Sequence, residues 1–436
     1  MNGFDLLYGL GVAIASPFWL IEPAARRKCL TAWSQRMGRI PPRQGTAPAI
    51  MIHAVSLGEI NAIRQLIQRL RADRPDVHTI ISTTTDTGFA RAQELYGRDA
   101  DVTLVRYPLD FTSAIHRLLD ALRPDVVVLM ELEVWPNFLS ICHRRKIPVL
   151  VINGRLTTHS FSRYRMVRPL VAGMFRKLSR ICAQDRTYAE RFIALGADPA
   201  SVSVTGTMKF DTASMDETVA GVQELAAAVG LVPKEGPVWV AGSTGPGEEE
   251  IILEAYRRLR EKFPTLRLVL VPRKPERFNE VADLIASCGM MALRRSRHDP
   301  PAKEAVILGD TMGELKKFYA LADVVFVGRT LLDLGPRQHG SDMIEPAALA
   351  KPVIVGPFTG NFAEPMACFL ASKAMKVVPD GQALTQTIDQ WLCDPAASAA
   401  MGLAARQVVA RERGATDRHA QIILQHLSPA VSGMIR

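Results

Sequence analysis

The strongest constraint on the fold is an alternation of short apolar runs with longer amphipathic stretches, which begins near residue 45. Runs such as Val126–Met130 contain no polar residue, as expected for strands of a parallel sheet that is covered on both faces. Stretches between them, such as Ile60–Ala72 and Ala114–Leu122, show helical spacing of apolar residues. The predicted strands are Ile50–Ala54, Thr79–Thr83, Val126–Met130, Val149–Ile152, Arg180–Ala183, Val202–Val204, Val238–Ala241, Arg267–Val271, Val306–Leu308, Val324–Val327 and Val353–Val355.

The strands form two series, because strand signals stop after Asp211 and resume at Val238. The intervening region has the pattern of a linker, and its interior can form a helix. We therefore predict an α/β protein with two Rossmann-like domains facing a cleft. The predicted parts are an apolar N-terminal segment (1–44), a first domain (45–212), a linker (213–236) and a second domain (237–436) that includes the closing helices within Ser398–Leu427.

The N-terminus contains the one stretch that approaches membrane-spanning length. Leu6–Ile21 is uncharged, but it is short for a span of about 20 residues and contains glycines and a proline. Basic residues follow this run at 26–28, which differs from a cleaved signal peptide and predicts that the main body stays in the cytoplasm. We predict a short anchor or an interfacial helix, with a buried first helix as the alternative. Candidates for contact with anionic headgroups, or else ordinary solvated charges, are Arg36, Arg39 and Arg43.

Composition excludes several classes of protein. A hydrophobic content of 48% without low-complexity tracts excludes an intrinsically disordered chain. The 6 cysteines have no metal-ligand spacing and indicate reduced thiols. The net charge of +9 favours anionic partners such as a membrane surface or a phosphorylated ligand. Because Lys and Arg are spread along the chain, we predict no nucleic-acid partner.

Unusual motifs follow several predicted strands, where ligands of open α/β sheets bind. HAVSLGE (53–59) follows the first strand, and ELEVWPN (131–137) follows the third. In the second half, AGSTGPG (241–247) ends the first strand, VPRKP (271–275) follows the next, and DMIEP (342–346) lies between two later strands. No phosphate loop, zinc-protease motif or nucleophile elbow is present.

Together these motifs resemble the 3-deoxy-D-manno-octulosonic acid (Kdo) transferases of lipid A assembly, over nearly the whole chain. The most specific parts are HAVSLGE (53–59), ELEVWPN (131–137), INGRLTTHSFSRY (152–164), GTMKFD (206–211), VPRKPERF (271–278) and EPAALAKPVIVGP (345–357). The resemblance implies an inverting GT-B glycosyltransferase that moves Kdo from CMP-Kdo to a lipid A precursor. It also implies no cofactor or catalytic metal, and catalytic domains on the cytoplasmic side of the inner membrane.

The resemblance assigns the chemistry to three residues. Glu59 looks like the general base that takes the proton of the attacking hydroxyl, although from the residues alone it is an ordinary acid in a first helical turn. Glu131 and Lys209 occupy the family's positions for transition-state support, with orientation of the acceptor or of the base as the alternative for Glu131. A cation at Lys209 can neutralise the sugar carboxylate or the departing phosphate, with a solvated loop lysine as the alternative. Glu133 shares a face with Glu131 in an extended segment.

The second half is expected to bind CMP. Arg273 can make paired hydrogen bonds to a phosphate, and Glu345 can accept hydrogen bonds from ribose hydroxyls. A predicted helix start at 312–314 offers backbone N–H groups to an anion, whereas Asp342 is equally explained as a helix N-cap. The candidate donor-binding residues are Ser243, Thr244, Pro272, Arg273, Met312, Gly313, Glu314, Asp342, Met343, Ile344 and Glu345.

Several positions depart from the family pattern. Family members usually carry His where Gly245 and Lys274 stand, and two glycines and a serine where Gly328-Arg329-Thr330 stands. The loop 334–341 is longer than usual, and a His-Asn-Pro triplet is replaced at 341–343. Either the donor pocket differs, or lost donor contacts are restored by Arg329, Arg337 or His339.

Two alternatives to Kdo transfer follow. A transferase for another CMP-activated acidic sugar, or for an altered lipid acceptor, would explain the departures in the donor loop. A non-catalytic lipid- or nucleotide-binding protein on this scaffold is disfavoured, because Glu59 and Lys209 are retained.

Overall fold

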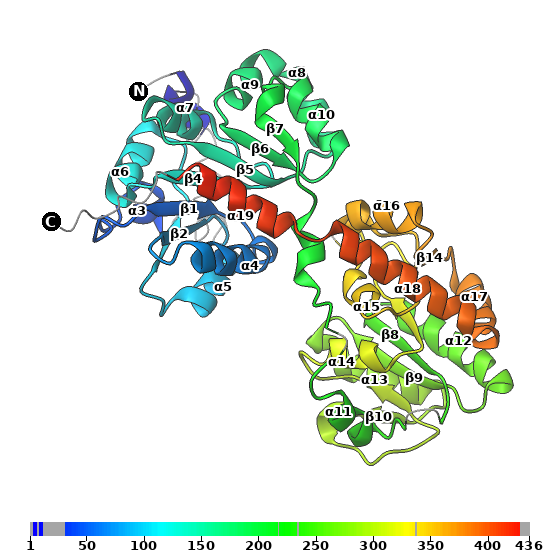
Figure 1. The fold of residues 1–436 in the computed structure, drawn as a ribbon. Coiled ribbons are helices and arrows are strands. Elements are labelled where there is room, and N and C mark those ends of the chain that lie inside the picture. Colours follow the sequence, from blue (N-terminus) through cyan, green and yellow to red (C-terminus); the bar gives the residue numbers. More distant parts are fainter. Residues whose placement is uncertain are drawn as a thin grey trace. The chain divides into compact units, whose positions relative to one another are not determined.

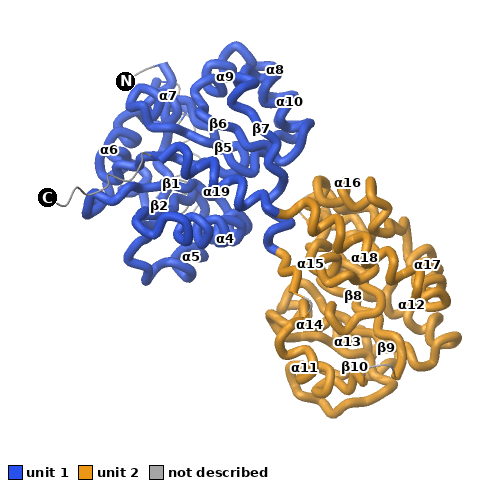
Figure 2. The backbone as a smooth tube through the Cα atoms, in the orientation of Figure 1, with its two compact units in different colours: residues 1–212, 414–436 blue, residues 213–413 orange. Residues whose placement is uncertain are grey.

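The computed structural model describes residues 3–6, 8–11, 31–216, 218–232, 235–335 and 338–427 (Figure 1). The chain forms two compact units, residues 1–212 with 414–436 and residues 213–413 (Figure 2). In the described ranges each unit is built on a seven-stranded sheet whose paired strands are all parallel. The predicted α/β class with two Rossmann-like domains is confirmed.

The first unit has the strand order β3-β2-β1-β4-β5-β6-β7. The strands are β1 (Ala49–His53), β2 (His78–Thr83), β3 (Val102–Arg106), β4 (Val126–Met130), β5 (Val149–Gly154), β6 (Arg180–Ala183) and β7 (Val202–Val204). Its helices are α3 (Trp33–Arg36), α4 (Leu57–Asp73), α5 (Asp86–Tyr96), α6 (Thr112–Leu122), α7 (Pro136–Arg144), α8 (Thr158–Met166), α9 (Arg168–Phe175), α10 (Arg186–Ala194) and α19 (Ala415–Gln425), with 3₁₀ turns η1 (Pro199–Ser201) and η2 (Met208–Thr212).

The second unit has the order β10-β11-β9-β8-β12-β13-β14. Its strands are β8 (Val238–Thr244), β9 (Arg267–Pro272), β10 (Ala292–Arg294), β11 (Val306–Leu308), β12 (Val324–Val327), β13 (Val353–Val355) and β14 (Lys376–Val377). Its helices are α11 (Val222–Val229), α12 (Glu248–Lys262), α13 (Phe278–Ser287), α14 (Leu315–Leu321), α15 (Ile344–Ala348), α16 (Ala363–Ala371), α17 (Gly381–Cys393) and α18 (Pro395–Glu412), with 3₁₀ turns η3 (Pro275–Arg277), η4 (Arg295–Arg297) and η5 (Gly360–Phe362).

β4 shows why the apolar runs become central strands. Val127 and Leu129 pack into one hydrophobic core, whereas Val126, Val128 and Met130 pack into the core on the other face of the sheet. Every predicted strand is found, within a few residues at its ends. The strands that sequence analysis missed, β3, β10 and β14, all lie at sheet edges, and β14 is only 2 residues long. Edge strands are partly exposed and therefore lack a continuous apolar run.

The boundaries of the two units differ from the predicted domain boundaries. Helix α19 lies along α4 in the first unit (Figure 1), where Ala420 and Ile423 share a core with Ile60 and Ile63. Residues 31–44 also belong to the first unit, and α11, predicted as linker, belongs to the second. The apolar face of a helix does not specify which core buries it, so sequence analysis placed α19 with its chain neighbours.

The apolar segment Leu6–Ile21 lies mostly outside the described residues. At its start, the Asp5 carboxylate accepts hydrogen bonds from the Thr112 N–H and the Asn137 amide, while Leu6 and Leu10 are exposed. In the described part of the chain, no helix combines the length and the apolarity needed to cross a bilayer.

Two of the three arginines considered for headgroup contact have intramolecular partners. Arg43 is buried and donates to the carbonyl oxygens of Leu122 and Ala47. Arg36 donates to the carbonyl oxygens of Thr31 and Thr84. For Arg43 a headgroup contact is therefore excluded by burial, whereas Arg39 is exposed.

Candidate active site

In the first unit, Glu59 and Glu131 follow neighbouring strands. The chain order of the sheet reverses between β1 and β4, and this switch point is where open α/β sheets bind ligands. Glu59 lies in the first turn of α4, three residues after its N-cap Ser56. Its carboxylate accepts hydrogen bonds from the Val55 N–H (2.9 Å) and the Ser56 hydroxyl (3.0 Å). This reciprocal cap fixes the position of the carboxylate.

The environment of Glu59 raises the pKa of its carboxyl group. Burial raises the pKa of Glu59 to about 7, against the hydrogen bond from the Val55 N–H that lowers it, and the charges of Glu131 and Glu133 raise it further. The Glu133 pKa is also raised, chiefly by burial. A carboxylate with a pKa near the working pH suits a general base, because it is ionised and yet basic enough to accept a proton.

Glu131 adopts a backbone conformation that side chains rarely occupy. Its φ of 56° lies in the left-handed region, which costs a residue with a side chain about 1–2 kcal/mol. The neighbouring strand holds this conformation, because the Glu131 N–H donates to the Ile152 carbonyl oxygen at 3.0 Å. Such strain is concentrated at functional sites, where it directs a side chain that a relaxed turn would point elsewhere.

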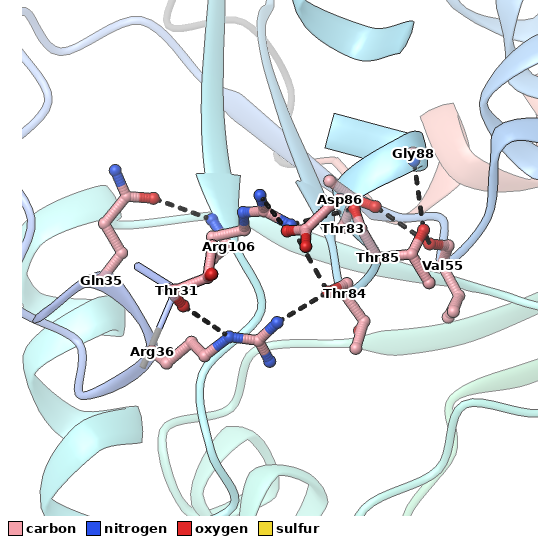
Figure 3. A network of polar contacts seen from close by, with 10 residues as sticks. All are labelled: Thr31, Gln35, Arg36, Val55, Thr83, Thr84, Thr85, Asp86, Gly88 and Arg106. Atoms are coloured by element: carbon pink, nitrogen blue, oxygen red, sulfur yellow. Dashed lines mark hydrogen bonds and ion pairs between the residues drawn. The ribbon is translucent and has the colours of Figure 1, made fainter. Parts of the chain in front are cut away.

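Figure 3 shows the polar contacts that hold the loop leading into α4. The Val55 carbonyl oxygen accepts hydrogen bonds from the hydroxyls of Thr83 (3.0 Å) and Thr85 (2.7 Å). Arg36 and Arg106 in turn donate to the backbone carbonyl oxygens of residues 84 and 85, and Arg106 also pairs with a carboxylate on α5. The loop after β2 therefore buttresses the loop after β1.

Lys209 lies in η2, whose neighbours are α4 and α19. The Met208 N–H donates to the Asn153 side-chain oxygen at the end of β5, and Met208 packs in the same core as α4. On the other side of Lys209, the buried Asp211 carboxylate accepts hydrogen bonds from the N–H groups of Gly414 (2.7 Å) and Thr416 (2.6 Å). Met208 and Asp211 thus anchor the 3₁₀ turn to the first unit on both sides of the lysine.

In the second unit, a pocket of about 380 Å³ gathers many of the predicted donor-binding residues. It lies at the carboxyl edge of β8, β9 and β12, and the chain order of this sheet reverses between β8 and β12. The predicted residues that line it are Ser243, Pro272, Arg273, Met312, Gly313 and Asp342. It is also lined by Arg329, from the loop after β12, and by Phe278 and Phe362.

Residues 31–212 match the family of 3-deoxy-D-manno-octulosonic-acid transferases (kdotransferases). The chain is 35% identical over 390 residues to the 3-deoxy-D-manno-octulosonic acid transferase of Haemophilus influenzae, covering 89% of this chain and 88% of the relative. It is 33% identical over 391 residues to that of Bordetella pertussis, covering 88% of each. This chain belongs to the Kdo transferase family.

Solved structures with low identity show that the fold is also found outside Kdo transferases. The UDP-GlcNAc 2-epimerase of Neisseria meningitidis matches 86% of this chain and 100% of its own, with a TM-score of 0.56 and 15% identity. A glycosyltransferase of Rickettsia africae matches 88% of this chain and 99% of its own, also with a TM-score of 0.56 and 15% identity. Because proteins with different named activities share this fold, the fold alone does not specify the reaction.

Five predicted donor-binding residues do not line the pocket of this Kdo transferase. Thr244 is buried and donates to Glu249 at 2.8 Å, and Glu314 accepts from Thr311 and pairs with Arg295. Met343 and Ile344 are buried in the core, so their side chains cannot contact a ligand in this structure. Glu345 is half-buried, and burial together with Asp342 raises the pKa of Glu345 to about 7.

Sequence analysis missed buried residues that support both sites. The Glu248 carboxylate accepts hydrogen bonds from four backbone N–H groups, those of Gly245 (2.8 Å), Arg329 (2.6 Å), Thr330 (2.9 Å) and Leu331 (2.9 Å). In the first unit, fully buried His419 of α19 contacts the Thr205 hydroxyl at 2.8 Å. Glu248 sits in a helical pattern of three successive glutamates, and nothing local distinguishes it from an exposed acid.

No cluster of three potential metal ligands occurs within the described ranges. The absence of a metal requirement therefore stays a prediction of the sequence analysis.

Proposed function

We propose that this protein transfers Kdo from CMP-Kdo to a lipid A precursor in lipopolysaccharide biosynthesis. Its family membership and the named activity of relatives at 33–35% identity support this function. The observation that carries the catalytic assignment is the position of Glu59. Glu59 is a capped carboxylate at the switch point of the first sheet. Burial, together with the charges of Glu131 and Glu133, raises the pKa of Glu59 to about 7.

In the proposed reaction, the first unit binds the acceptor and the second binds the donor. A sugar hydroxyl of the acceptor attacks the anomeric carbon of Kdo, and its proton passes to Glu59. The bond between the anomeric carbon and the CMP phosphate breaks on the opposite face, so the configuration inverts and CMP leaves with the bonding electrons. Lys209 and Arg273 are the cations assigned to the anionic groups of the donor.

The direct test is to incubate the purified full chain with a lipid A precursor and with CMP-Kdo generated in situ. We expect Kdo-modified lipid from the wild type and a 10²- to 10⁴-fold slower reaction from Glu59→Gln, as is typical for loss of a general base. Glu94→Gln, an exposed acid on α5, is the matched control and should react at the wild-type rate. Wild-type turnover by Glu59→Gln would remove Glu59 from this role.

A second candidate is transfer of another CMP-activated acidic sugar, favoured by Arg329 in the donor pocket. Competition between CMP-Kdo and other CMP-linked acidic sugars in the same reaction decides between the two. Preferred incorporation of Kdo supports the first proposal, and preferred incorporation of another sugar supports the second.

We also propose that the protein acts at the cytoplasmic face of the inner membrane. The apolar run Leu6–Ile21 and the basic residues after it support this placement. Deleting residues 1–24 should lower membrane recovery and raise the KM for a bilayer-embedded acceptor, with little change for a detergent-dispersed one. Because the deletion also removes Asp5, which binds Thr112 and Asn137, Asp5→Ala is the control for lost packing. Unchanged sedimentation with membranes at high salt would place the anchor elsewhere.

A further inference from the structure

Arg329 has a backbone that its surroundings fix on both sides. Its N–H donates to the Glu248 carboxylate at 2.6 Å, and its carbonyl oxygen accepts from the Gly340 N–H at 2.7 Å. Its φ is 60°, in the left-handed region that glycine tolerates and other residues rarely adopt. Glycine at position 329 would make the same backbone contacts without the strain. The backbone contacts therefore do not explain why an arginine stands here.

The side chain of Arg329 leads into the donor pocket. It lines the 380 Å³ pocket together with Arg273. Its Nε atom is buried and has no hydrogen-bond partner within the described ranges. A buried guanidinium N–H without a partner is costly unless a ligand accepts from it.

The electrostatics of the pocket favour an anion. The pKa of Arg329 is lowered, first by burial and then by the neighbouring charge of Arg273, with Glu248 acting in the opposite direction. The Glu248 carboxylate already accepts hydrogen bonds from four backbone N–H groups, one of them that of Arg329 itself. Two guanidinium groups that face one pocket are both stabilised when an oxyanion binds between them.

Gly245 lies against the side chain of Arg329. A Cβ atom at Gly245 would lie 3.0 Å from Arg329 Cγ and 2.5 Å from Leu334 Cδ1. A side chain at position 245 would therefore crowd the observed paths of Arg329 and Leu334. The two departures from the family pattern, Gly245 and Arg329, belong to one local arrangement.

We propose that Arg329, together with Arg273, binds an anionic oxygen group of the nucleotide-sugar donor. This inference rests on the proposed function and adds a donor-binding residue to it. The donor carries two such groups, the phosphate of the nucleotide and the carboxylate of the sugar. Each of these groups has two oxygen acceptors that can receive paired hydrogen bonds from one guanidinium.

The decisive variant is Arg329→Gly in the full chain, because glycine removes the guanidinium and suits the observed φ. We expect its melting temperature to equal or exceed that of the wild type. Arg329→Lys retains the charge without the paired donors and should have an intermediate effect. Arg297→Gln, at an exposed arginine in η4 outside the pocket, is the matched control and should behave as the wild type.

Calorimetric titration with CMP and with cytidine, and the KM for CMP-Kdo, separate the two sources of the anion. If Arg329 binds the phosphate, Arg329→Gly weakens CMP binding about 10- to 100-fold and leaves cytidine binding unchanged. If it binds the carboxylate, CMP binding is unchanged and the KM for CMP-Kdo rises by a similar factor. Either result supports the proposal.

If a folded Arg329→Gly variant has the wild-type affinity for CMP and the wild-type KM for CMP-Kdo, the proposal is overturned and Kdo transfer remains established. A wild-type protein that neither binds CMP nor transfers Kdo would overturn the proposed function, and this inference with it.

Discussion

At the scale of single residues, Glu59 combines a structural role with the catalytic role that we propose for it. Its carboxylate caps the start of α4, and burial raises its pKa to about 7. The folded state keeps this proton while the unfolded state loses it near pH 4.5. The stabilisation from this proton is therefore complete below pH 4.5 and is lost as the pH rises to about 7. Ionisation of Glu59, which the proposed reaction requires, thus lowers the free energy of unfolding.

The pH dependence of transfer should follow the ionisation of Glu59. At saturating donor and acceptor, we expect kcat to fall about tenfold per pH unit below pH 7, because the protonated acid cannot act as a base. Glu131→Gln removes a charge that raises the pKa of Glu59, so the inflection should move to lower pH even though the rate itself falls. Glu94→Gln, remote on α5, should leave the inflection in place. An unmoved inflection in Glu131→Gln would contradict the coupling between the two carboxylates.

Gly88 packs against residues that hold the loop leading into α4, so its substitution tests the importance of these contacts. A Cβ atom at Gly88 would lie 2.6 Å from the Thr83 hydroxyl and 2.9 Å from the Val55 carbonyl oxygen, so Gly88→Ala must displace the loop that caps Glu59. We expect a loss of about 1–3 kcal/mol in the free energy of unfolding, measured by denaturant titration, and a lower kcat. Gly173→Ala on α9, where a Cβ meets nothing within 4 Å, should be neutral or stabilising. Equal stabilities for the two variants would show that the loop tolerates the displacement.

At the scale of elements, α19 supports the turn that carries Lys209. The chain leaves the first unit after residue 212 and returns at 414, and Asp211 binds the returning backbone at Gly414 and Thr416. His419 and Arg418 of the same helix contact Thr205, just before this turn. A C-terminal helix therefore completes a site whose other residues come from the first half of the chain.

Asp211→Ala should lower the stability of the first unit by about 1–3 kcal/mol, because two backbone N–H groups lose a buried acceptor. Transfer should fall as Lys209 becomes less well positioned, while CMP affinity, measured by calorimetry, should be unchanged because the donor pocket is in the second unit. Asp417→Ala on the same helix removes only an exposed pair with Arg69 and should cost less than about 1 kcal/mol. A loss of CMP affinity in Asp211→Ala would show that its effect is not confined to the first unit.

At the scale of the whole molecule, the two units place their candidate groups in the same way. In each sheet the chain order reverses at the central strands, between β1 and β4 or between β8 and β12, and the candidate residues follow those strands. The first unit contributes carboxylates at this edge, with Lys209 on η2, and the second contributes two arginines together with Asp342. This difference in charge matches the separate tasks of proton removal and binding of an anionic donor.

This division predicts that transfer does not need a divalent metal. In the proposed reaction, Arg273, Arg329 and Lys209 are the groups that carry positive charge toward the anionic donor. We expect full activity after treatment with EDTA and dialysis, measured as Kdo transfer with donor that is synthesised separately. A loss of activity that magnesium restores, and that sodium at equal ionic strength does not, would contradict this prediction.

The sequence by itself determined the two α/β domains, most strands and the positions of Glu59, Glu131 and Arg273 at strand ends, because strand burial and helix spacing are written in local periodicity. Only the tertiary structure decided which unit buries α19, that Thr244 faces Glu249, and that Glu248 holds the loop of Arg329. These outcomes depend on contacts between residues up to more than 200 positions apart, as between Asp211 and Thr416, which no local pattern encodes. The acidity of Glu59 likewise depends on Glu131, a neighbour that only the pairing of β1 with β4 brings close.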